Sequence, residues 1–259
     1  MEHLIIRGQR LEVVRLTPAV ARPNAPTLVF LHEGLGSVSM WRDFPQRVAD
    51  ATGCPALVYS RLGYGRSEPI AQARPVRYMH DEALVTLPAL LDAMHVHAPI
   101  LFGHSDGGSI ALIHAGGAAR PVRAVIAMAP HVMVEEISVT SIAQAKTAYQ
   151  TTELPKRLAK YHDHVDSAFC GWNDIWLHPE FRDWNIEEYL PRIASPILAI
   201  QGLDDEYGTM EQIDRIGHQA RDAELLKLAD CGHSPHKDQP DAVIVAVRAF
   251  VARVLEDRS

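Results

Sequence analysis

The stretch that decides the fold is Ile100-Leu101-Phe102-Gly103-His104-Ser105-Asp106-Gly107-Gly108-Ser109-Ile110-Ala111-Leu112. It begins with three apolar residues, passes through the pattern G-x-S-x-G and continues into a segment of helical character. This order predicts a strand, a sharp turn and a helix. The two flanking glycines leave room for the chain to reverse, and they would hold the Ser105 hydroxyl in front of the helix N-terminus. The pattern therefore indicates a serine nucleophile at position 105.

A base and an acid for this serine follow later in the chain. A serine hydroxyl needs a base that is oriented by an acid, and in this architecture the order is Ser, then Asp or Glu, then His. The apolar run 197–200 is followed by Gly202-Leu203-Asp204-Asp205, and the run 225–228 by Asp230-Cys231-Gly232-His233. Both segments come directly after a predicted strand, where open α/β sheets place their sites.

Short apolar runs bounded by Pro, Gly or Asn indicate the rest of the sheet. Several runs are apolar at consecutive positions, which is typical of strands covered on both faces, so we expect an α/β fold with a mostly parallel sheet and helices on both faces. Helical spacing predicts helices over 83–94 and 242–255. The predicted strands cover 11–16, 27–31, 56–59, 100–102, 122–128, 197–200 and 225–228.

A segment of about sixty residues without strand signals interrupts this pattern, and it holds three of the four tryptophans. Its candidate helices are 141–151, 154–162 and 186–193. We expect residues 131–190 to form a helical lid, or cap, and residues 1–130 and 191–259 to form the core.

Composition excludes several classes of protein. The 259 residues are 47% hydrophobic and 22% charged, with a net charge of -7 and no cluster of Lys or Arg, so nucleic acid is not an expected partner. No run of apolar residues is long enough for a membrane span, and the first eight residues do not resemble a signal peptide. Three scattered cysteines predict neither disulfides nor a zinc site. We expect a cytoplasmic protein without cofactor or metal; no oligomeric state is predicted.

With these motifs in place, the sequence resembles the α/β-hydrolase superfamily, and within it the lid-bearing serine hydrolases that include esterases and aromatic-degradation hydrolases. The resemblance implies Asp205 as the acid, with Asp204 as the fallback, and His233 as the base. It also matches Leu31-His32-Glu33-Gly34-Leu35-Gly36 to the loop that supplies the oxyanion hole. The implied donors are the backbone N–H groups of Gly34 and Asp106.

Two residues depart from the family pattern, because Glu33 stands where Gly is common and Ser60 where Asp is common. A carboxylate facing a developing oxyanion would raise its energy, so we expect both acidic side chains beside the hole to turn away. Asp106 would point to its helix N-terminus, and Glu33 to an arginine such as Arg42 or Arg61. We expect this acidic rim to disfavour anionic acyl groups.

Other polar clusters receive structural interpretations. His162-Asp163-His164 is interpreted as a solvated helix face of the lid rather than a metal site. His104 is interpreted as a packed turn residue rather than a second base. Cys231 is interpreted as small and buried.

The predicted mechanism is two-step acyl transfer through an acyl-enzyme at Ser105. The substrate would be a small or medium ester bound under the lid, and four aromatic residues are the candidates for the apolar wall. A thioesterase and a carbon-carbon hydrolase of ring-fission products remain alternatives, as does a ligand-binding receptor without turnover. The candidate wall residues are Trp172, Trp176, Phe169 and Tyr161.

Overall fold

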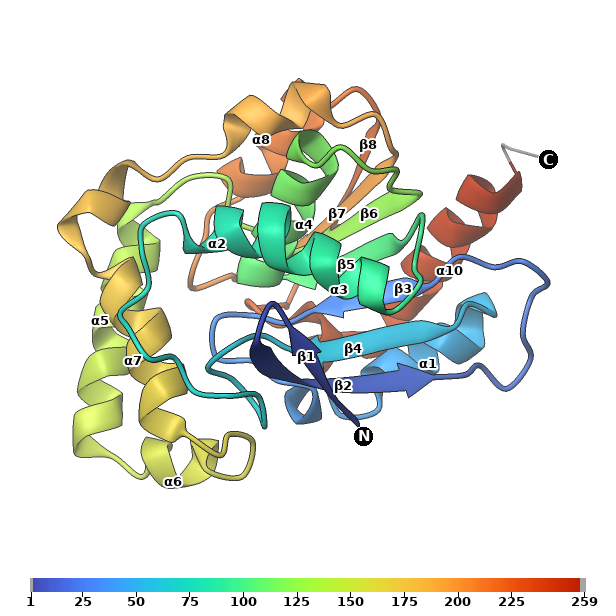
Figure 1. The fold of residues 1–259 in the computed structure, drawn as a ribbon. Helices are drawn as coiled ribbons and strands as arrows, with labels where there is room; N and C mark the ends of the chain where they lie inside the picture. Colours follow the sequence, from blue (N-terminus) through green and yellow to red (C-terminus); the bar gives the residue numbers. More distant parts are fainter. Residues whose placement is uncertain (1, 257–259) are drawn as a thin grey trace.

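An eight-stranded sheet in the order β1-β2-β4-β3-β5-β6-β7-β8 forms the centre of the molecule, seen in a computed structural model that describes residues 2–256 (Figure 1). Neighbouring strands from β4 to β8 are parallel, whereas β2 is antiparallel to both β1 and β4. The predicted α/β class with a mostly parallel sheet is confirmed. The strands are β1 (Glu2–Ile6), β2 (Gln9–Leu16), β3 (Leu28–Leu31), β4 (Ala56–Ser60), β5 (Ile100–His104), β6 (Ala124–Met128), β7 (Ile197–Gly202) and β8 (Ala223–Leu228).

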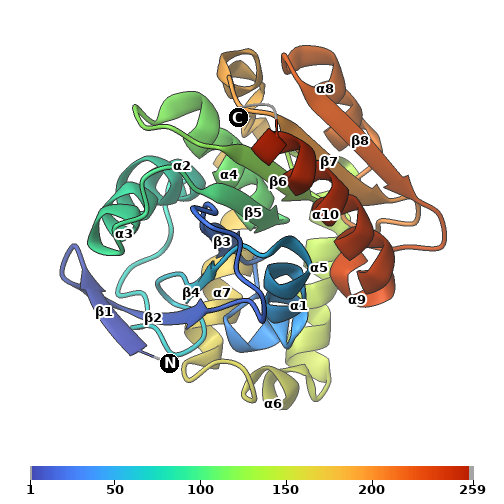
Figure 2. The same cartoon turned by 90° about the vertical axis from the view of Figure 1, so that its right-hand side faces the viewer.

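Helices cover both faces of the sheet. α1 and α10 pack together on one face, and α2, α3, α4 and α8 lie on the other (Figure 2). A π-helical turn, η2 (Glu82–Thr86), joins α2 to α3, so the predicted helix over 83–94 is divided between η2 and α3. The short 3-10 turn η1 (Ser39–Trp41) precedes α1. The helices are α1 (Phe44–Thr52), α2 (Tyr78–Asp81), α3 (Leu87–Ala93), α4 (Asp106–Gly117), α8 (Glu211–Gln219), α9 (Pro235–Asp238) and α10 (Pro240–Glu256).

The strands divide their side chains between two apolar layers. Phe30 and Phe102 belong to the layer under α1 and α10, whereas Val29 and Leu101 belong to the layer under α2, α3 and α4. Alternate residues of a strand point to opposite faces, so a strand covered on both sides must be apolar at every position. This explains the unbroken apolar runs that predicted the sheet.

Residues 131–190, the segment predicted to be an inserted lid, contain three helices grouped at one end of the sheet (Figure 1). They are α5 (Glu136–Thr151), α6 (Leu154–Leu158) and α7 (Val165–Trp176), followed by the 3-10 turns η3 (Pro179–Asp183) and η4 (Glu187–Arg192). The predicted helix over 186–193 is present as the 3-10 helix η4, which packs on α4 rather than with the three helices at the sheet end. The α7 helix was not predicted, and α6 ends before residues 159–162.

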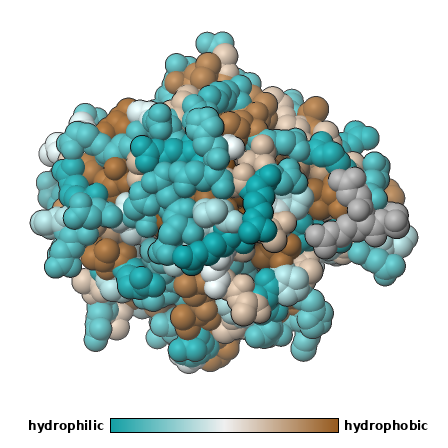
Figure 3. Space-filling model, turned by 90° about the horizontal axis from the view of Figure 1, so that it is seen from above, coloured by the Kyte–Doolittle hydropathy of each residue, from teal (hydrophilic) through white to brown (hydrophobic). Residues whose placement is uncertain are grey.

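The face seen in Figure 3 is mainly hydrophilic, with small apolar groups distributed across it. The exposed large apolar side chains, such as Val20 and Val245, lie far apart in the sequence. Within residues 2–256, no helix is long and apolar enough to cross a membrane.

Candidate active site

Ser105 occupies the sharp turn between β5 and α4. Its φ of 52° and ψ of -120° are unfavourable for a residue with a side chain, and such strain is common at functional sites. The neighbouring glycines are required by close packing: a Cβ on Gly103 would collide with the backbone of Gly107, and a Cβ on Gly107 with the backbone of Leu31. The G-x-S-x-G pattern therefore encodes a turn held directly against β3.

Ser105, His233 and Asp205 lie in one hydrogen-bonded line. Nε2 of His233 is 3.0 Å from Oγ of Ser105, and Nδ1 of His233 is 2.8 and 3.0 Å from the two carboxylate oxygens of Asp205. Ser105 follows β5, Asp205 follows β7 and His233 follows β8, so the carboxyl ends of these parallel strands bring the three residues together. This geometry allows the imidazole to accept the serine proton while the carboxylate fixes its tautomer.

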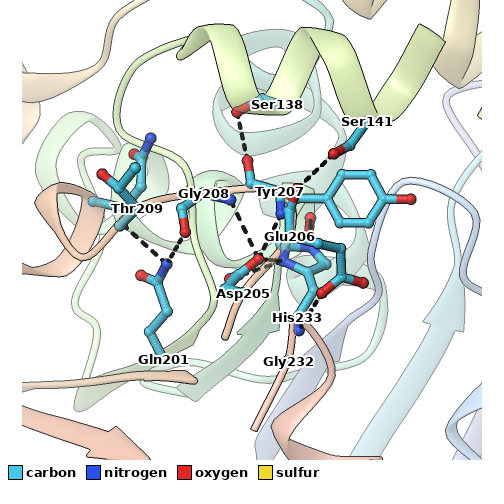
Figure 4. Close-up of polar contacts among 12 residues, drawn as sticks. Ser138, Ser141, Gln201, Asp205, Glu206, Tyr207, Gly208, Thr209, Gly232 and His233 are labelled. Carbon is cyan, nitrogen blue, oxygen red and sulfur yellow. Dashed lines mark hydrogen bonds and ion pairs between the residues drawn. The ribbon is translucent and has the colours of Figure 1, made fainter. Parts of the chain in front are cut away.

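The loop after β7 selects Asp205 rather than Asp204 for this line. Oδ1 of Asp205 accepts hydrogen bonds from the backbone N–H groups of Tyr207 and Gly208 (Figure 4). Burial raises the pKa of Asp205, but the charge and hydrogen bond of His233 and the N–H of Tyr207 outweigh it, so the pKa is lowered. Asp204 is exposed.

Two serines of α5 fasten the same loop to the insertion. Ser138 donates a hydrogen bond to the backbone carbonyl of Tyr207, and Ser141 donates one to the carbonyl of Glu206 (Figure 4). From the core side, Gln201 donates to the carbonyls of Gly208 and Thr209. The loop that carries Asp205 is thus held from both sides.

The Asp106 side chain joins the turn at Ser105 to two other helices. Its buried carboxylate accepts hydrogen bonds from the Tyr78 hydroxyl at 2.7 Å and from Nε1 of Trp176 at 3.2 Å, and lies 3.6 Å from Nη1 of Arg61. The side chain therefore reaches α2 and α7 instead of lying along its own helix N-terminus as expected. Asp106 is the first residue of α4, so its backbone N–H has no partner within the helix.

Glu33 does not point to Arg42 or Arg61, and that expectation is wrong. Its carboxylate lies 3.5 Å from Nδ1 of His104 and 3.7 Å from Nζ of Lys237, whereas Arg61 donates to the Glu33 backbone carbonyl. Burial raises the pKa of Glu33, but the hydrogen bond and charge of His104 and the charge of Lys237 hold it well below its usual range. His104 also hydrogen-bonds to the backbone carbonyl of His233 through Nε2, so this buried turn residue helps to position His233.

A cavity of about 100 Å³ opens in front of Ser105. Of the four candidate wall residues, Trp172 and Trp176 line it, whereas Phe169 stacks on Tyr149 outside the lining and Tyr161 is not among the lining residues. The Gly34 loop closes one side, where a Cβ on Gly34 would overlap the Trp172 ring. The lining residues are Glu33, Gly34, Leu35, His104, Ser105, His131, Ile142, Trp172, Trp176, Tyr207, His233 and Ser234.

Sequence reasoning missed the contributions of His131 and Tyr207 to this cavity. Each follows a strand end by a few residues, and this position is the only signal in the sequence. The interpretation of His162 as solvated is wrong: it is buried, its Nδ1 accepts from the backbone N–H of Gly65, and its Nε2 donates to the carbonyl of Leu35. Residues 2–256 hold no cluster of three His, Cys, Asp or Glu that could bind a metal.

Comparison with known families agrees with this arrangement. A model described as the Alpha/beta hydrolase family matches residues 28–247, which include the nucleophile turn and the loops that carry Asp205 and His233. The protein therefore belongs to the Alpha/beta hydrolase family, a family of hydrolases.

Individual relatives are distant. The putative carbamate hydrolase RutD of Stutzerimonas stutzeri is 24% identical over 82% of this chain and 86% of its own. A 2-succinyl-6-hydroxy-2,4-cyclohexadiene-1-carboxylate synthase of Klebsiella pneumoniae is also 24% identical, over 89% of this chain and 96% of its own. A crystal structure from a study of Nitrososphaera gargenis carboxylesterases superimposes with a TM-score of 0.79 at 18% identity, covering 99% and 100% of the two chains. At this identity the structural likeness shows the fold alone.

Proposed function

We propose that the protein is a serine hydrolase that cleaves small carboxylic esters through an acyl-enzyme intermediate. The observation that carries the proposal is the line from Ser105 through His233 to Asp205, with distances of 3.0 and 2.8 Å, at the wall of a cavity. In the proposed reaction, Ser105 attacks the ester carbonyl while His233 takes its proton and passes it to the leaving alcohol. Water then resolves the acyl-enzyme by the same route.

The proposed oxyanion hole consists of the backbone N–H groups of Gly34 and Asp106. Its support is that Gly34 lines the cavity beside Ser105, and that the Asp106 N–H stands at the start of α4, where the helix dipole favours negative charge. One such donor is typically worth about 3 to 4 kcal/mol in the transition state. The adjacent Asp106 carboxylate is engaged elsewhere and does not face the developing charge.

The size of the cavity supports a small substrate. Ligand pockets for larger organic molecules usually measure about 300 to 1,000 Å³, whereas the space in front of Ser105 measures about 100 Å³. We therefore propose Trp172 and Trp176 as walls for a short acyl or alcohol group, and we expect activity to decrease with chain length.

Hydrolysis of p-nitrophenyl esters from acetate to dodecanoate, recorded with early-time bursts, tests this proposal. The expected result is a burst with a short-chain ester that is absent in Ser105→Ala. Asp205→Asn should lower kcat by a factor on the order of 10⁴, whereas the adjacent control Asp204→Asn should change it less than twofold because that side chain is exposed. Equal losses in the two aspartate variants, or a burst that survives in Ser105→Ala, would refute the assignment.

A further inference from the structure

The cavity wall carries an ionisable side chain that the proposed acyl transfer does not use. His131 follows β6, the strand between those that lead to Ser105 and Asp205, and its side chain lines the same cavity. Its ring centroid lies 5.8 Å from that of His233 and 4.9 Å from that of Trp176. A second imidazole therefore lines the cavity near the ring of His233.

The hydrogen-bonding capacity of this imidazole is unused within the described part of the chain. Burial, and next the charge of His233, lower the pKa of His131 to about 4, so the ring is neutral at ordinary pH. Its Nδ1 is fully buried and has no hydrogen-bond partner, whereas Nε2 is not among the fully buried atoms that lack a partner. Since an enclosed N–H without an acceptor is costly, the proton is better placed on Nε2, where a molecule in the cavity can accept it.

The backbone around His131 is fixed in place. The Ser109 hydroxyl donates a hydrogen bond of 2.6 Å to the His131 carbonyl and accepts one of 3.0 Å from the His131 N–H. Ser109 lies one turn along α4 from Ser105, so the helix that begins at the nucleophile also positions the second imidazole. Only 2% of His131 is exposed. Such a preorganised donor loses little entropy when it binds a ligand.

We propose that His131 is a specificity-determining residue whose Nε2–H donates a hydrogen bond to a substrate oxygen other than that of the reacting carbonyl. The site would then prefer esters that carry an ether, carbonyl or hydroxyl oxygen close to the ester group over hydrocarbon esters of equal length. The oxygen could belong to the acyl or to the alcohol part, and the recognition chemistry is the same. This inference rests on the proposed esterase function.

Matched esters test the inference by turnover. p-Nitrophenyl methoxyacetate and p-nitrophenyl butyrate differ by one oxygen in place of a methylene, as do 2-methoxyethyl acetate and butyl acetate on the alcohol side. The preference for the oxygen-bearing ester, measured as a ratio of kcat/KM values, should fall about three- to tenfold in His131→Phe for one of the two pairs. Intrinsic reactivity cancels because the same pair is compared in both proteins. Unchanged ratios for both pairs would overturn the inference.

His131→Gln is the matched variant, because it keeps an N–H donor in a side chain of similar reach. It should retain more of the preference than His131→Phe, whereas a purely steric role would make the two variants lose it alike. Urea unfolding of each variant verifies that it is folded, and His131→Leu replaces His131→Phe if the phenyl ring prevents folding.

Binding without turnover separates failure of the inference from failure of the proposed function. Ser105→Ala protein can be titrated with 1-methoxypropan-2-one against pentan-2-one, which mimic the acyl-side pair, and with 5-methoxypentan-2-one against heptan-2-one, which mimic the alcohol-side pair, while tryptophan fluorescence is followed. Adding His131→Phe should lower the relative affinity for the methoxy ketone about three- to tenfold in one of the two pairs. Ratios that do not change for either pair would overturn the inference even if the esters react, and a lowered ratio would support it even if they do not.

Discussion

Replacing Asp106 with alanine should destabilise the protein far more than removing an exposed ion pair. The Asp106 carboxylate is fully buried and is shared by Tyr78, Trp176 and Arg61. Alanine would leave the Tyr78 hydroxyl without its acceptor, whereas Nε1 of Trp176 would keep that hydroxyl as an acceptor at 3.1 Å. It would also take the nearest carboxylate from the Arg61 side chain, which is 2% exposed. The carboxylate therefore links the turn at Ser105 to α2 and α7.

The expected loss follows from these contacts. Removing one partner of a buried ion pair costs about 3 to 5 kcal/mol, and each donor left unsatisfied costs about 1 to 3 kcal/mol. These contributions are not additive because they share one carboxylate. Arg61 also keeps its hydrogen bond to the Glu33 carbonyl and the nearby charge of Glu82. We therefore expect a loss of about 3 to 5 kcal/mol in the free energy of unfolding.

Urea unfolding at pH 7, followed by circular dichroism, measures this loss. The matched control is Asp92→Ala, because Asp92 pairs with Arg120 at 2.8 Å but its side chain is 72% exposed; exposed pairs contribute about 0 to 1 kcal/mol. The double variant Arg61→Met, Asp106→Leu should be more stable than Asp106→Ala, since the buried guanidinium is removed together with its carboxylate. A loss below about 1 kcal/mol for Asp106→Ala, no larger than that of the control, would refute this account.

Three further predictions concern the cavity. Gly34→Ala should lower kcat/KM at least about tenfold, because its Cβ overlaps Trp172, and Trp172→Ala should restore part of the activity in the same kinetic assay. Burial lowers the pKa of His131 from about 6.5 to about 4, so the unfolded chain takes up this proton at a higher pH than the folded protein does, and the free energy of unfolding falls as the pH drops through that window. Between pH 7 and pH 4, urea titrations should therefore show that His131→Phe loses about 3 kcal/mol less free energy of unfolding than the wild type. The rate of butyrate ester hydrolysis relative to that of the succinate monoester should be highest in Lys237→Met, intermediate in the wild type and lowest in Glu33→Gln, because Lys237 offsets the negative charge of Glu33. The reverse order would contradict the expectation that the acidic rim disfavours anionic acyl groups.

The features that could be predicted from the sequence are those written in local patterns. G-x-S-x-G marks a turn because two backbones approach too closely for any larger residue at positions 103 and 107. Positions just after apolar runs point to the pair Asp204-Asp205 and to His233, since the ends of parallel strands meet at one edge. Spacing alone leaves Asp204 and Asp205 open, and the N–H groups of Tyr207 and Gly208 decide between them in space.

The contacts that could not be predicted join residues far apart in the chain. Trp176 is 70 residues from Asp106, and His162 is 127 residues from Leu35. His162 lies in a polar segment after α6, and this composition is typical of a solvated loop. It is buried because α6 ends early and the following turn brings the ring against the loops near Gly65 and Leu35. The periodicity of apolar residues in the sequence does not predict such tertiary packing.

These two long-range contacts couple the insertion to both sides of the proposed oxyanion hole. Trp176 donates to the Asp106 side chain, and His162 donates to the carbonyl of Leu35, the residue next to Gly34. A movement of α7 and the preceding turn that widened the cavity would have to break both hydrogen bonds and release both loops. We therefore expect the geometry of the proposed oxyanion hole to depend on the position of residues 131–190, so that substrate binding energy that holds this segment in place would also assemble the hole.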